Sequence, residues 1–159
     1  MANITTDQVW AEVEKHLFGV LGMVSAQNEA RTVGIVYVVR DRVLYIGSGK
    51  ETWKVKHIAA NPHVSMTVTI PKSIPFMPWV KVPAATITFT GMARLLSVEE
   101  AGPEVMALLF RGMADAEDIR KNTAIIAVEP EGDFVTYGVG VSLMEMRDTT
   151  KARGRAPVA

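Results

Sequence analysis

The clearest absence in this sequence is cysteine. None of the 159 residues is a cysteine, which excludes disulfides, thiolate metal sites and cysteine nucleophiles. No apolar run is long enough to span a membrane, because the longest, Phe18 to Val24, falls far short of the roughly 20 residues required. Residues 1–14 also lack the basic and then apolar pattern of a secretory signal. We therefore expect a cytoplasmic protein.

An excess of charge of either sign is missing too, since 17 Lys and Arg balance 17 Asp and Glu. A neutral chain gives neither nucleic acid nor an anionic membrane a reason to be its main partner, and we expect neither. The three histidines, His16, His57 and His63, show no metal-binding spacing, so no metal site is expected. No catalytic residue can be assigned from the sequence.

Apolar residues, by contrast, are plentiful. They make up 48% of the chain, against 21% charged residues. A chain of this length most simply folds as one domain over residues 1–159. The apolar excess suits a fold that also buries surface against a partner subunit.

Periodicity and turn signals predict a mainly β chain with flanking helices. Capping boxes at Thr5 and at Ser97 predict helices that reach about Leu17 and Phe110. Short runs rich in β-branched residues predict strands between and after these helices, the last two around a turn at 130–133. An antiparallel barrel is the natural closure for so many short strands. The predicted strands are 18–26, 31–39, 43–46, 64–70, 85–96, 123–128 and 134–139.

Two segments fall outside this pattern. Residues 71–83 carry four prolines together with Phe76, Met77 and Trp79, and cannot form a central strand. They are either a surface loop pinned by its own hydrophobic residues or a cover over a ligand pocket. The basic tail at residues 147–159 has little to bury and is expected to be partly flexible.

The most informative segment is a strand, a turn of small residues and a short helix. The strand from Leu44 runs into Gly47-Ser48-Gly49, and a helix then begins near Thr52. A helix N-terminus presents unpaired backbone N–H groups to an anion; Thr52 can cap it and Lys54 adds a charge. Neither a Walker A motif nor a Rossmann fingerprint fits the glycine spacing. The local residues leave a phosphate site and an ordinary strand-to-helix turn equally open.

Residues 52–68, with Leu44-Tyr45 before them and 91–95 after them, resemble the pyridoxamine 5′-phosphate oxidase family of FMN-binding split barrels. The likeness spans roughly residues 18–96. It implies a six-stranded antiparallel split β-barrel and a homodimer with FMN at the subunit interface. It also implies a flavin-dependent oxidoreductase, whose small-molecule substrate the sequence does not identify.

The resemblance also implies a set of FMN contacts. The phosphate grip falls on Thr52 and Lys54, with Ser48 close by and Arg31 approaching from an earlier strand. Trp53 stands where the oxidases usually hold an arginine; either Lys50 or Lys56 replaces that cation, or the tryptophan packs on the ring or the partner subunit. The residues matched to the flavin ring are Val33, Gly34, Ile35, Val36 and Thr86.

Other ligands remain open on the same fold. Relatives of this fold bind a deazaflavin or haem, and a flavin-binding module without turnover is a further alternative. Pyridoxamine phosphate oxidase itself is disfavoured, because the segment 151–155 is basic but is not the W-R-x-x-R motif with which those enzymes hold their substrate.

Overall fold

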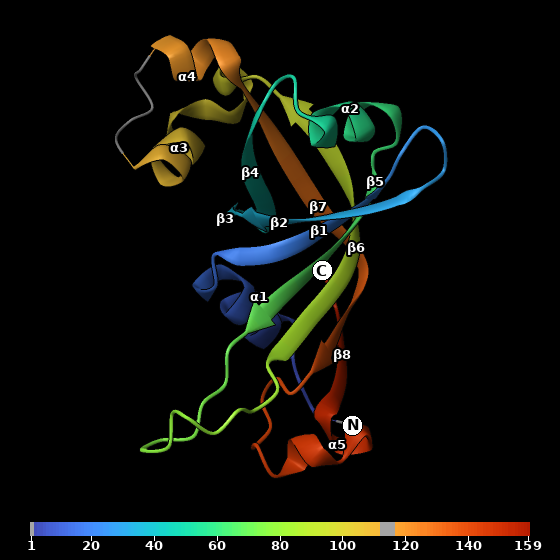
Figure 1. Ribbon diagram of the computed structural model, residues 1–159, viewed down its shortest axis with the longest axis vertical. Helices are drawn as coiled ribbons and strands as arrows, with labels where there is room; N and C mark the ends of the chain where they lie inside the picture. Colours follow the sequence, from blue (N-terminus) through green and yellow to red (C-terminus); the bar gives the residue numbers. More distant parts are fainter. Residues whose placement is uncertain (1, 112–116) are drawn as a thin grey trace.

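An antiparallel sheet of eight strands curls into a half-barrel in the computed structural model, which describes residues 2–111 and 117–159 (Figure 1). Seven strands follow the order β2-β1-β5-β6-β7-β4-β3, and β8 pairs with β7. The strands are β1 (Phe18–Val24), β2 (Ala30–Val36), β3 (Val38–Arg40), β4 (Val43–Gly49), β5 (His63–Ile70), β6 (Ala85–Leu96), β7 (Thr123–Tyr137) and β8 (Arg153–Pro157).

The curl brings the two ends of this strand order together, because β2 and β3 are joined through the single residue Tyr37. The predicted strand 31–39 is thus two strands. Tyr37 is fully buried, and its hydroxyl donates to the Val13 carbonyl oxygen at 2.8 Å. Burial raises the pKa of this phenol well above its ordinary value, so it stays a neutral donor. The predicted split barrel is confirmed, with eight strands rather than six.

Helices flank the sheet at the predicted places. Both capping boxes form, Thr5 with Gln8 and Ser97 with Glu100, as the sequence predicted. The N-terminal helix lies against the barrel through Val9, Trp10 and Val13, and edge-to-face contact joins the Trp10 and Phe134 rings. The helical elements are α1 (Thr6–Lys15), α2 (Trp53–Ala60), α3 (Val98–Phe110), α4 (Glu117–Asn122), η1 (Glu145–Arg147) and α5 (Thr149–Ala152). Among the described residues, none of these helices is both long and apolar enough to cross a membrane.

The predicted turn at 130–133 is wrong. Residues 123–137 form one 15-residue strand, β7, which pairs along most of β6. A register shift between Thr88 and Thr90 and the positive φ of Gly132 let the strand bend there without ending. The long partner β6 therefore converts a sequence with hairpin character into an irregularity within a strand.

The expectation of a flexible tail is also wrong for residues 153–157. They form β8, which pairs with β7 at five positions, from Asp133↔Pro157 to Tyr137↔Arg153. Ala152, Gly154 and Ala156 are buried at alternate positions. The side chains of Thr6 and Trp10 donate to the backbone of Pro157 and Val158 at 2.7 and 2.9 Å. The C-terminal segment thus joins the sheet to α1.

Candidate functional site

The turn between β4 and α2 is held by two hydroxyl side chains. Ser48 Oγ and Thr52 Oγ1 lie 2.9 Å apart and share a hydrogen bond, and Thr52 Oγ1 also donates to the Gly49 carbonyl oxygen at 2.9 Å. Ser48 is buried on β4, and Thr52 stands at the N-cap position of α2. The small residues of Gly47-Ser48-Gly49 let this turn close tightly around both hydroxyl groups.

Thr52 does not cap α2 as the sequence predicted. Its backbone has N-cap geometry, but its side chain accepts no hydrogen bond from the helix, because Ser48 and Gly49 engage the hydroxyl instead. The first N–H groups of a helix have no intrahelical acceptor. The start of α2 therefore presents N–H donors and the positive end of its dipole to an incoming anion.

A hollow of about 540 Å³ opens beside this turn. Among the described residues it is lined by two cations, Lys50 and Lys121, and one carboxylate, Glu51. Lys121 is paired with Glu117 at 2.6 Å, and Glu51 with Lys56 at 3.5 Å. Lys54 is half-buried on the first turn of α2. Open N–H donors, hydroxyl groups and several lysines form a donor set that suits a phosphate.

Trp53 does not supply the missing cation, and its ring is 43% exposed at the start of α2. The ring lies edge-on to His57, with centroids 5.4 Å apart. Lys56, one of the two proposed substitutes, is an exposed surface residue whose nearest acid is Glu51. Lys50 lies in the hollow and is the better placed of the two.

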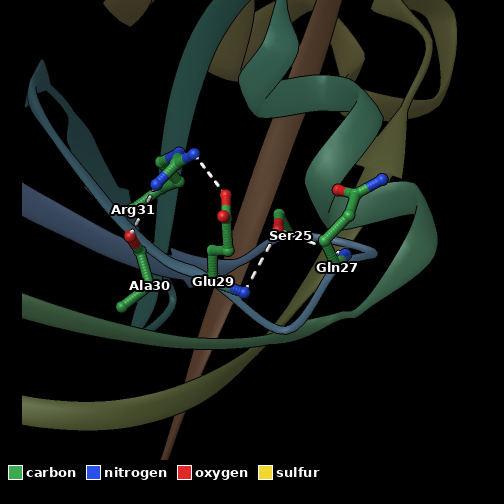
Figure 2. Close-up of polar contacts among 5 residues, drawn as sticks. All are labelled: Ser25, Gln27, Glu29, Ala30 and Arg31. Atoms are coloured by element: carbon green, nitrogen blue, oxygen red, sulfur yellow. Dashed lines mark hydrogen bonds and ion pairs between the residues drawn. The ribbon is translucent and has the colours of Figure 1, made fainter.

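Arg31 is bonded to its own strand and turn, and not to the turn before α2, among the described residues. Figure 2 shows its guanidinium directed at the Glu29 carboxylate, to which Nη2 donates at 2.5 Å. The Ser25 hydroxyl accepts from the backbone N–H of Gln27 and Glu29 at 3.2 Å, which fixes the turn before β2. Arg31 lines a separate hollow of about 300 Å³ with His63. Among the described residues, no hydrogen bond joins Arg31 to Thr52.

Four of the five residues matched to the flavin ring, Val33 to Val36, lie on β2, a strand at one end of the sheet order. Gly34 and Val36 are exposed, whereas Ile35 is buried in the core and Val33 packs against that core. The ring of Phe18, itself 51% exposed, covers the position where a Cβ on Gly34 would stand. The backbone of β2 and its outward positions remain accessible to a ligand, but the Ile35 side chain does not.

Thr86 lies far from the α2 turn within one chain. It pairs with Thr69 and Tyr137, near the start of β6. Ser48 on β4 pairs with Ala124 on β7. The next residue of β7, Ile125, pairs with Leu96, which lies ten residues beyond Thr86 on β6. Ten residues of strand span roughly 30 Å, which is longer than an FMN molecule. The structure does not bring Thr86 and Thr52 into one site of a single chain.

Three residues that line these hollows, Lys121, Asn122 and His63, were not predicted as site residues from the sequence. Lys121 and Asn122 reach the α2 turn through the pairing of β4 with β7, which sets Gly49 opposite Thr123. His63 joins Arg31 through the pairing of β1 with β5. These juxtapositions depend on sheet register between distant segments, so no local pattern signals them. No cluster of three or more His, Asp or Glu that could hold a metal occurs in residues 2–111 and 117–159.

Several solved structures share this fold. A Listeria innocua protein provisionally named a pyridoxamine 5′-phosphate oxidase is 23% identical, with a TM-score of 0.62 over 79% of this chain and 93% of its own. A heme binding protein from Mycobacterium smegmatis has a TM-score of 0.71 at 11% identity, covering 99% of this chain and 60% of its own. HutZ, a heme storage protein from Vibrio cholerae, has a TM-score of 0.62 at 16% identity, covering 86% and 98%.

The sequence itself matches a family model. The model described as pyridoxamine 5′-phosphate oxidase covers residues 5–134, from the capping residue of α1 to the far half of β7. No curated protein matches the chain at a significant level. On the strength of the family model, which spans most of its length, this chain belongs to the pyridoxamine 5′-phosphate oxidase family.

Proposed function

We propose that this protein is an FMN-binding flavoprotein that acts as an oxidoreductase on a small molecule. The observation that carries the proposal is the α2 turn, where open helix N–H groups, the Ser48–Thr52 hydroxyl pair and nearby lysines meet. A phosphate monoester dianion is the ligand that this donor set fits best. Family membership supports a flavin nucleotide as the bearer of that phosphate.

In this proposal the protein binds and orients, and does little acid–base chemistry itself. When bound, the isoalloxazine ring supplies the hydride or electron transfer. Thr52 and Lys54 would hold the phosphate, with Ser48 fixing the Thr52 hydroxyl and Lys50 adding positive charge. The exposed backbone of β2 at Gly34 and Val36 would lie along the ring. The exposed ring of Trp53 would add an apolar surface beside it.

We further propose that the active form is a homodimer with the flavin between its subunits. An exposed apolar patch supports this, formed by Leu17, Phe18 and Val36, which are 45%, 51% and 63% exposed. Phe18 and Val36 are direct cross-strand partners, so the patch is continuous and is suited to burial by a second copy. A second copy would also let Thr86 approach a ring whose phosphate the first copy holds.

Paired affinity measurements test the phosphate site. A charge-assisted hydrogen bond contributes roughly 1.5–3 kcal/mol, so Lys54→Ala should weaken FMN binding by about 10- to 100-fold. Riboflavin lacks the phosphate, and its affinity should barely change. Thr52→Ala should weaken FMN binding less, by about 1 kcal/mol, and rising salt should narrow the gap between wild type and Lys54→Ala.

Lys56→Ala is the matched control, since Lys56 lies on the same helix but pairs with Glu51 on the surface. It should leave the affinity for FMN unchanged. Equal losses of FMN and riboflavin binding in Lys54→Ala would show that Lys54 supports the fold instead. No loss for either ligand would refute the assigned phosphate site.

A haem-binding relative is the second candidate, and His63 is the observation that favours it. His63 is exposed and lines the same hollow as Arg31. An imidazole is a common axial ligand of haem iron, and a guanidinium suits a propionate carboxylate.

The absorption spectrum of the purified protein separates bound FMN, deazaflavin and haem, and a haem band should disappear in His63→Ala. Oxidation of a reduced nicotinamide with a dye acceptor separates a flavoenzyme from a flavin carrier.

A further inference from the structure

The segment between β5 and β6, residues 71–84, exposes large apolar side chains to solvent. Phe76 is 96% exposed and Trp79 is 74% exposed, and Met77 and Val80 add smaller exposed areas. Figure 1 shows this segment projecting from the lower end of the molecule. The loop is therefore not pinned by its own hydrophobic residues, which was one of the two alternatives that the sequence left open. An exposed aromatic surface of this kind marks an interaction site.

The loop is shaped by turns that hold its aromatic residues outward. The N–H of Met77 donates to the Ile74 carbonyl at 3.1 Å, and the N–H of Val80 donates to the Met77 carbonyl at 3.1 Å. Pro75 followed by a positive φ of 66° at Phe76 is the pattern of a type II turn, in which glycine is favoured at the second of the two central residues, here Phe76. The chain therefore carries a bulky aromatic residue at a position where glycine would be less strained.

The charges on the loop itself are all of one sign. Lys72 and Lys81 flank the apolar tip, and residues 71–84 contain no carboxylate. Behind the loop lies a hollow of about 280 Å³ that it shares with residues 143–147. That neighbouring segment adds Arg147 at the hollow and Met144, which is 70% exposed. It also carries one exposed carboxylate, Glu145, which accepts hydrogen bonds from the backbone N–H and the hydroxyl of Ser142 at 2.9 and 2.7 Å. This end of the molecule thus combines a protruding apolar tip with basic residues at its base.

We propose that this loop docks the protein on an anionic lipid bilayer. Phe76 and Trp79 enter the boundary between headgroups and acyl chains, where aromatic rings are favoured. Lys72 and Lys81 contact lipid phosphate and carboxylate groups, since basic residues near a negative leaflet each add attraction. The neutral net charge, from which no membrane partner was expected, conceals this local concentration of cations.

Co-sedimentation with lipid vesicles tests the proposal. The full chain should bind vesicles made of equal parts phosphatidylserine and phosphatidylcholine, and bind vesicles of phosphatidylcholine alone much more weakly. Each lysine contributes about 1 kcal/mol at an anionic surface, so Lys72→Gln with Lys81→Gln should weaken binding about 30-fold. Phe76→Gly should weaken it at least about tenfold, since a buried phenylalanine ring is lost. That change also relieves the positive φ, so the fold should survive.

Tryptophan fluorescence gives a readout that a merely structural role would not move. Trp79 emission should shift to the blue on vesicle binding, and the shift should vanish in Trp79→Phe while binding persists. Leu108→Ala is the control, because Leu108 is 46% exposed on α3, at the other end of the molecule in Figure 1, and its binding should be unchanged. Equal binding to both vesicle types, or none to either, would overturn the proposal. So would loop variants that dissociate a homodimer, which would assign the loop to a subunit contact.

Discussion

The two ends of the half-barrel are built in different ways. At the α2 end, the Gly47–Thr52 turn combines small residues, hydroxyl groups and helix N–H donors within one short stretch of chain. At the opposite end, residues 71–84 expose apolar side chains, and the neighbouring structure depends on β8, which pairs with the distant strand β7. The first end is locally encoded and polar, whereas the second is assembled from distant segments and is apolar.

This difference suggests a division of labour between the ends. A phosphate site needs backbone donors in a fixed direction, which a tight turn and a helix start provide. A surface that binds a membrane or a protein needs exposed apolar area. The strands that carry such a surface must themselves be stable. On this view, β8 and the N-terminal residues stabilise the end that carries the loop. Ala2 N–H donates to the Arg153 carbonyl oxygen at 2.7 Å, which joins the two termini there.

Removal of residues 153–159 should have the largest effect. The truncation deletes the β8 partners of five β7 residues and the backbone acceptors of Trp10 and Thr6. It also deletes the buried Ala156. With about 1 kcal/mol for each lost hydrogen bond, the free energy of unfolding should fall by at least about 4 kcal/mol, which lowers the Tm by about 10 °C or more. Thermal unfolding followed by circular dichroism measures the loss. Removal of Ala159 alone is the control, and an unchanged Tm after the longer deletion would show that β8 is dispensable.

The sequence predicted the α2 end well, because its signals are local. The glycine turn and the start of α2 near Thr52 are read from neighbouring residues, as are both capping boxes. Two details failed at this end. The side-chain cap did not form, since the competing partner Ser48 lies four residues earlier on a strand, and Lys121 and Asn122 reach the turn only through the pairing of β4 with β7. The sequence preference for threonine at an N-cap predicts where the helix begins, but not which groups the threonine hydroxyl bonds to.

The other end was predicted poorly, because its structure depends on register between distant strands. Pro130 to Asp133 has the composition of a turn, yet pairing with β6 carries β7 through it. Residues 153–157 are basic, and they become a strand because small residues alternate with the charged ones. Only β7 provides the surface against which Gly154 and Ala156 are buried. The composition of residues 153–157 therefore shows that they are charged, but it does not show that β7 lies beside them.

Gly91→Ala, in the middle of β6, should have the next largest effect. A Cβ on Gly91 would lie 2.5 Å from the Glu129 carbonyl oxygen and 3.1 Å from its carbon, and a backbone neighbour cannot rotate away. We expect a loss of about 1–3 kcal/mol in the free energy of unfolding, as for other overpacked sites. Urea denaturation measures it, with Gly132→Ala as a contrast in which φ is positive but no atom lies within 4 Å. An unchanged midpoint for Gly91→Ala would show that β6 and β7 separate readily here.

Glu29→Gln tests whether Arg31 can serve the phosphate site. In the present structure the Arg31 guanidinium is paired with Glu29, with both side chains about half exposed. Removal of the carboxylate frees the guanidinium and removes a repelling charge, so FMN affinity should rise about fivefold while riboflavin affinity stays constant. Glu129→Gln, which breaks the similar exposed pair with Arg94, should change neither affinity. If FMN affinity does not rise, Arg31 is not among the residues that hold the phosphate.

Thr136→Val should have the smallest effect, and it should be a gain. Thr136 is 1% exposed beneath β8, and its buried hydroxyl has no hydrogen-bond partner among the described residues. An unpartnered buried hydroxyl costs roughly 1–3 kcal/mol, and a methyl group of similar size removes that cost. Part of the gain is lost to crowding, because the methyl group is larger than the hydroxyl group and faces the backbone of Gly154. The free energy of unfolding should therefore rise by about 1 kcal/mol.

Urea denaturation with an unchanged m-value tests this, and Thr136→Ser, which keeps the hydroxyl and loses the methyl group, should be less stable than wild type. A loss of stability in Thr136→Val would show that the hydroxyl has a partner in solution and that β8 is held to β7 by a polar contact as well.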